Sequence, residues 1–119
     1  MIHSLKITKA ADLTAVAAAL HDARFIAGGI DFNRTARSFI LKCRVFEPKS
    51  AALDSSRHWQ AYRLSFANVI DCEVNVREKV PYYELATIRF APRERRLDLV
   101  THYGIEIGLR LGEFYGILA

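Results

Sequence analysis

Residues 61–77 alternate apolar and polar side chains, which is the pattern of a β-strand with one buried and one exposed face. An extended strand of this length would measure about 55 Å, whereas a compact domain of this size has a diameter of about 35 Å. We therefore expect the strand to bend or break at Ala67–Asn68, where a short polar side chain interrupts the apolar face. The apolar residues at even positions are Tyr62, Leu64, Phe66, Ile70, Cys72, Val74 and Val76.

A different period appears in residues 10–22. Leu13, Val16, Ala17 and Leu20 recur at the spacing of one helix face. Alanine supplies high helix propensity between them, and Asp12 complements the positive end of the helix dipole. The pattern predicts an amphipathic helix that packs its apolar stripe against the sheet.

Further alternating segments predict an antiparallel sheet joined by short turns. The glycine pair Gly28–Gly29 interrupts one of these segments, which indicates a bulge or a close backbone approach. We expect one α+β domain over residues 1–119, with one N-terminal amphipathic helix packed on a curved sheet of six to eight strands that forms a half-barrel or sandwich. The loop composition of 47–57 predicts the longest irregular segment. The remaining expected strands are 2–7, 24–32, 37–46, 82–90, 96–101, 105–111 and, as a strand or a helical turn, 114–118.

Four glycines recur every four residues near the end of the sequence: Gly104, Gly108, Gly112 and Gly116. In a strand this spacing places them on one face and leaves the backbone there bare. The pattern is consistent with a sheet edge that bends through glycine, or with a surface that a partner or ligand approaches closely.

The composition is that of an ordinary globular protein, with 51% hydrophobic and 25% charged residues in 119. A formal net charge of +4 is compatible with nucleic acid or an acidic partner. However, the cations are spread along the sequence and alternate with acids, which makes nucleic acid the less favoured partner. Cys43 and Cys72 lie at apolar positions of expected strands, so we expect buried free thiols. Residues 1–6 have no signal-peptide pattern and no segment is long enough to span a bilayer, so we expect a cytoplasmic protein without membrane contact.

Motifs that would identify an enzyme are missing from the sequence. The four histidines lack zinc-ligand spacing, and there is no phosphate-binding glycine loop or nucleophile elbow. His21–Asp22 is compatible with a base and its orienting acid, or with a histidine that interacts with a helix dipole. We therefore expect no cofactor, no metal and no catalytic residue, and lean against an enzyme.

The segment around the single tryptophan is the best candidate for recognition. Tryptophan and arginine dominate binding hot spots, and an arginine over a tryptophan adds cation–π attraction, although tryptophan is also common in cores. If Tyr82, Tyr83 and Arg89 met Arg63 on one sheet face, they could stack single-stranded bases. The candidate ligand- or partner-binding residues are Arg57, His58, Trp59, Arg63 and Tyr83.

Several short segments together resemble a family of small bacterial proteins described only as a domain of unknown function. That family has no assigned activity, so the resemblance implies a bacterial cytoplasmic setting and no site residues. The matching segments are Leu5-Lys6-Ile7, Ala11-Asp12-Leu13, Leu20-His21-Asp22-Ala23, Arg37-Ser38-Phe39 and Leu64-Ser65-Phe66 with Val69.

Three functional hypotheses follow. The first is a non-enzymatic binding or protein-interaction module acting as a homodimer, with Ile40, Phe46, Val69 and the glycine face available for contact. The second is a small-ligand-binding protein or small enzyme with a pocket in the mouth of the curved sheet, near Trp59. The third is a nucleic-acid-binding protein.

Overall fold

The computed structural model describes residues 4–48 and 57–119, which form ten strands, one α-helix and two 3₁₀ turns. The strands pair in the order β1-β10-β5-β4-β2-β7-β8-β9-β6, and β3 pairs with β4 beside β2. All of these pairings are antiparallel. In chain order the elements are β1 (Leu5–Ile7), η1 (Ala10–Asp12), α1 (Leu13–Ala19), β2 (Arg24–Phe25), η2 (Ala27–Gly29), β3 (Ile30–Asn33), β4 (Ser38–Pro48), β5 (Arg57–Phe66), β6 (Val69–Val76), β7 (Tyr83–Ala91), β8 (Arg96–Thr101), β9 (Ile105–Leu111) and β10 (Gly116–Leu118).

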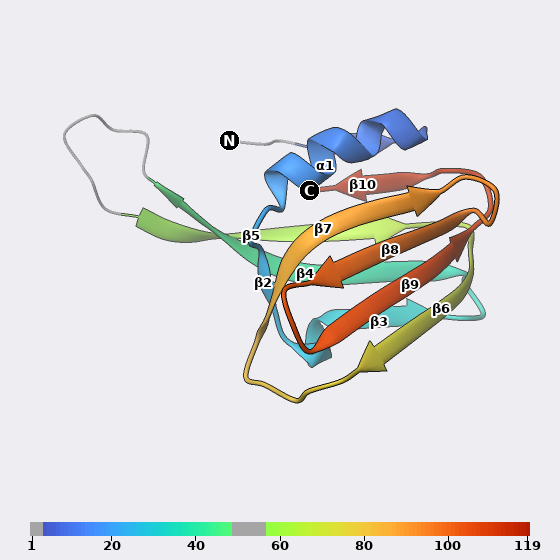
Figure 1. The fold of residues 1–119 in the computed structure, drawn as a ribbon. Helices are drawn as coiled ribbons and strands as arrows, with labels where there is room; N and C mark the ends of the chain where they lie inside the picture. The colour runs from blue at the N-terminus through green and yellow to red at the C-terminus, as the bar shows by residue number, and fades with distance from the viewer. Residues whose placement is uncertain (1–3, 49–56) are drawn as a thin grey trace.

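The short strand β2 joins the two halves of the sheet, since Arg24 pairs with Arg44 of β4 on one side and with Glu84 of β7 on the other. Figure 1 shows β6, β7, β8 and β9 as one layer in front of β3, β4 and β5. Buried side chains from both layers, such as Leu41 and Ile107, belong to one hydrophobic core. The expected α+β architecture, mostly antiparallel sheet with one helix, is confirmed.

The expectation of six to eight strands is wrong, because two expected segments divide. Segment 24–32 becomes β2 and β3, separated by η2, where Gly29 lies against β4: a Cβ there would be 2.8 Å from the Lys42 carbonyl oxygen. Segment 61–77 becomes parts of β5 and β6. The helix is not strictly N-terminal, because β1 precedes it, in the order of the expected segments 2–7 and 10–22.

The predicted break at Ala67–Asn68 is confirmed. Asn68 adopts φ 57°, a left-handed conformation that asparagine tolerates better than most residues. Its backbone carbonyl accepts a hydrogen bond from the Gly112 N–H at 2.8 Å. The chain therefore leaves the layer of β5 here and enters the opposite layer as β6.

The predicted buried face is correct in β5 and wrong in β6. Tyr62, Leu64 and Phe66 are buried, but Val74 and Val76 are 41% and 47% exposed. The pairing with β9 shifts between Val69 and Asp71, and β6 is the last strand of the sheet. An irregularity and an open edge, neither visible in the alternation, leave these side chains uncovered.

The helix is shorter than the predicted 10–22, since its first turn is the 3₁₀ turn η1. Before it, the Asp12 carboxylate accepts hydrogen bonds from the Thr8 and Lys9 backbone N–H groups at 2.9 and 3.3 Å. The Thr8 bond lowers the pKa of Asp12. Leu13, Val16 and Leu20 of the expected stripe are buried in the common core, and α1 lies above β10 and β7 in Figure 1. No helix in the described ranges is long and apolar enough to cross a membrane.

Two of the surfaces expected for a homodimer are filled by the chain itself. Val69 is fully buried, so its expected exposure is wrong. On the glycine face, a Cβ at Gly108 would lie 2.9 Å from Arg96 Cζ, and one at Gly116 would lie 2.7 Å from Phe66 Cδ1. These glycines make room for neighbouring side chains. The ends of the predicted loop 47–57 belong to β4 and β5, and its other residues lie outside the described ranges.

Candidate functional site

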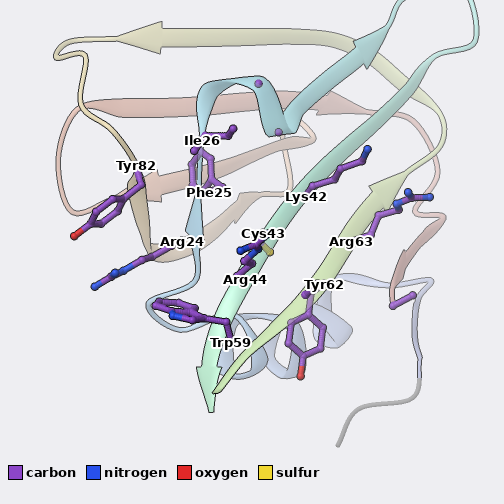
Figure 2. A pocket seen from close by; sticks show the side chains of 14 residues that line it. Arg24, Phe25, Ile26, Lys42, Cys43, Arg44, Trp59, Tyr62, Arg63 and Tyr82 are labelled. Atoms are coloured by element: carbon purple, nitrogen blue, oxygen red, sulfur yellow. The ribbon is translucent and has the colours of Figure 1, made fainter. Parts of the chain in front are cut away.

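A groove of about 860 Å³ lies over β2, β4 and β5 on the side of the sheet that faces away from the core (Figure 2). Its lining includes four cationic side chains and two exposed aromatic side chains, and we refer to these six residues as the basic face. They are Arg24, Lys42, Arg44, Arg63, Trp59 and Tyr82.

The alternation of strand side chains places these residues outside. In β4, Leu41 and Cys43 are buried, so Lys42 and Arg44 between them point outward. Antiparallel register then sets Lys42 opposite Arg63 and Arg24 opposite Arg44. Like charges directly opposite each other on neighbouring strands repel, so this arrangement opposes folding when no anion is bound.

Acidic side chains neutralise only part of this charge. Arg24 Nε lies 3.3 Å from Glu84 Oε2, in a half-exposed ion pair between β2 and β7. Among the acidic side chains that the structure describes, none forms an ion pair with Lys42, Arg44 or Arg63. The described part of the groove therefore carries an excess of positive charge.

The two aromatic rings hold Arg24 in position. Its guanidinium lies 4.4 Å from the centre of the Tyr82 ring and 4.9 Å from that of Trp59, both within cation–π range. Figure 2 shows Arg24 extending between these two rings. The Trp59 ring also contacts Phe46, with ring centres 4.8 Å apart. Trp59 thus has Arg24 and Phe46 as neighbours, which limits the area left for stacking a ligand.

Of the candidate residues, Trp59 and Arg63 lie in the groove and Tyr83 does not. Tyr83 is 2% exposed, and its hydroxyl donates to the Glu78 carbonyl at 3.0 Å. His58 is exposed but alternates with Trp59, so it points to the other side of β5. The side chain of Arg57 lies outside the described part of the structure.

The cations that complete the basic face are Arg24, Lys42 and Arg44, which the candidate set did not include. Alternation in 37–46 already placed Lys42 and Arg44 on the face of the strand that points away from its buried residues. The missing information was the register, which brings them beside Arg63 across a long connection. Of the residues expected to form a base-stacking surface, only Tyr82 and Arg63 line the groove.

Two other kinds of reactive side chain occur in the structure: the histidines paired with Asp22, and the two cysteines, of which Cys43 lies at the base of the groove. Asp22 bridges two histidines, with His21 Nδ1 at 3.1 Å and His102 Nε2 at 2.8 Å. Cys43 is a buried free thiol, as expected, whereas Cys72 is free but only half-buried, since β6 lies at the edge of the sheet. Burial raises the pKa of Cys43 to about 12, and partial burial also raises that of Cys72, so neither thiol is activated as a nucleophile. Among the described residues, no three His, Cys, Asp or Glu side chains are placed to hold a metal ion.

No family model, curated protein or solved structure matches the chain significantly. The resemblance to a bacterial domain of unknown function therefore stays a prediction. The proposed function therefore rests on the charges and the geometry of the basic face.

Proposed function

We propose that the protein is a non-enzymatic binding module whose basic face holds a phosphate-bearing ligand. The proposal rests chiefly on one observation: four cations gather on three neighbouring strands, and Arg24 is the only one of these four that forms an ion pair with a described acidic side chain. An anion bound between them would relieve the repulsion of the two like-charged cross-strand pairs.

The kinds of cation favour phosphate groups. Arginine presents a planar fork of N–H donors that matches phosphate oxygens, and lysine adds a compact charge. Outward side chains lie about 5 Å apart across neighbouring strands and about 7 Å apart along one strand. This spacing suits a ligand with more than one anionic group, such as a pyrophosphate or consecutive phosphates of a nucleic-acid strand.

The aromatic residues favour recognition of charge over recognition of bases. Single-strand readers need open aromatic faces on which bases stack. Here Trp59 contacts Arg24 and Phe46, and Tyr82 contacts Arg24. We infer that the rings fix the Arg24 guanidinium so that less side-chain entropy is lost on binding.

Isothermal titration with pyrophosphate, with adenosine triphosphate and with a short oligothymidylate tests this proposal. Arg44→Ala and Arg63→Ala should each weaken binding by about tenfold, because each removes a charged hydrogen-bond donor. Arg93→Ala is the matched control, since Arg93 is exposed in the turn between β7 and β8 and should bind like the unaltered protein. Binding of none of the three ligands, or equal effects of Arg44→Ala and Arg93→Ala, would contradict the proposal.

The same titrations separate the two sources of phosphate. A small-ligand site should bind one pyrophosphate or one nucleotide per chain. Its affinity for the oligonucleotide should be no higher than for these small ligands. A nucleic-acid site should favour the oligonucleotide, with an affinity that falls steeply as salt rises through counterion release. The homodimer and the bacterial cytoplasmic setting expected from the sequence stay predictions.

A further inference from the structure

In the described structure, the outer edge of β6 is unpaired after Val69, whose N–H donates to the Arg37 carbonyl at 2.9 Å. β6 is the last strand in the sheet order and pairs only with β9. The Arg77 N–H donates to the Gly104 carbonyl at 2.7 Å, on the β9 side. Backbone groups alternate direction along an antiparallel strand, so Cys72, Val74 and Val76 direct their N–H and C=O groups to the open edge.

The side chains of the same three residues form an apolar surface at that edge. Cys72, Val74 and Val76 stand opposite Leu109, Ile107 and Ile105 of β9, and therefore share the face that lines the core. The three β9 residues are buried, while Val74 and Val76 are 41% and 47% exposed. Natural sheet edges are usually protected by lysine, proline or inward charges, and this face of β6 has none.

Charges on the other face of the strand indicate which partner fits. Asp71 and Glu73 lie in the first part of β6, and Arg77 follows its last residue. Two antiparallel copies centred on Val74 would place Asp71 of each copy opposite Arg77 of the other. Val74 would face its own counterpart, and Cys72 would face Val76. Registers centred on Cys72 or Glu73 would instead oppose carboxylates.

We propose that a second copy of this chain pairs antiparallel with β6 across a two-fold axis at Val74. The two four-stranded layers then form one continuous sheet, and each copy covers the exposed valines of the other. Asp71 and Arg77 already contact Arg34 and Glu106, at 3.3 and 3.7 Å. Both contacts involve exposed side chains and are worth little, so they do not prevent a new pairing.

Sedimentation velocity over a range of protein concentrations tests the interface. The unaltered protein should form dimers, and Val74→Lys should weaken dimerisation at least about tenfold by placing two ammonium groups at the axis. Tyr115→Lys is the control, because Tyr115 is exposed in the segment between β9 and β10, outside β6, and should leave the dimer intact. An unaltered protein that stays monomeric at about millimolar concentration, or a Val74→Lys dimer of normal affinity, would overturn the proposal.

A charge exchange tests the register without changing the apolar face. Asp71→Arg and Arg77→Asp should each weaken the dimer, because each opposes like charges, and the double variant should restore it. Glu113→Arg makes the same charge change as Asp71→Arg at an exposed position elsewhere and should have no effect. A double variant as weak as the single ones would overturn this register. Arg44→Ala should dimerise normally, so failure here is distinct from failure of the phosphate site.

Discussion

Asp22 shows how one residue can close a helix and connect distant elements. It adopts φ 59° just after α1, a left-handed conformation that aspartate and asparagine accept. Its backbone N–H donates to the Leu85 carbonyl at 3.1 Å, and its carboxylate accepts a hydrogen bond from His102 at 2.8 Å. The end of the helix is thereby joined to β7 and to the turn before β9.

The hydrogen bond from His102 lowers the pKa of Asp22 below its ordinary value of 3.8. A lowered folded-state pKa stabilises the fold above the unfolded pKa, and this stabilisation is lost as the pH falls through the folded value. Asp22→Asn keeps the backbone conformation and removes the charge. We expect it to lower the melting temperature at about pH 6 and to have little effect at about pH 2.

Thermal unfolding of both proteins across this range checks the prediction. The two melting temperatures should converge as the solution is acidified. A constant difference at all pH values would show that the carboxylate charge is not responsible.

At the scale of elements, the packing of β10 against β5 depends on a glycine, which has no side chain. Gly116 of β10 lies opposite Phe66 of β5, where a Cβ would be 2.7 Å from Phe66 Cδ1 and 2.9 Å from the Ser65 carbonyl oxygen. Phe66 is 2% exposed and cannot swing away into solvent. β10 therefore holds its place between β1 and β5 only with glycine at this position.

Gly116→Ala should lower the free energy of unfolding by about 1–3 kcal/mol, the usual cost of overpacking a filled site. Gly112→Ala is the matched control, because its Cβ would lie 3.5 Å from Asn68 Cβ, an ordinary contact. Denaturant unfolding monitored by the single tryptophan measures both. Equal stability of the two variants would contradict the proposed packing role.

At the scale of the whole molecule, the basic face opposes stability. Lys42 and Arg63 stand opposite each other, as do Arg24 and Arg44, and each pair repels in the absence of a bound anion. Binding sites often retain such unfavourable arrangements because the ligand compensates for them.

Lys42→Gln should therefore raise the free energy of unfolding by about 0.2–1 kcal/mol while weakening phosphate binding. Pyrophosphate should raise the melting temperature of the unaltered protein more than that of the variant, because a ligand that binds the native state stabilises it. Parallel melts with and without pyrophosphate measure both effects. A variant that is less stable, or one that responds equally to pyrophosphate, would contradict this account.

The sequence by itself determined the local elements, because their causes are local. The spacing of Leu13, Val16 and Leu20 predicted the helix, and alternation predicted the inner faces of β4 and β5. The short polar side chain of Asn68 identified the point where the strand breaks. Alternation could not show that the core face of β6 lies at an open edge, since that depends on which strand is its neighbour.

The tertiary structure alone decided the candidate site. Arg24, Lys42 and Arg63 are far apart in the sequence, and only the pairing of β2, β4 and β5 brings them together. Register depends on the free energy of the complete core, so no short stretch of sequence encodes it. Tyr83 shows the same point, since its neighbour Tyr82 lines the groove while Tyr83 turns into the core.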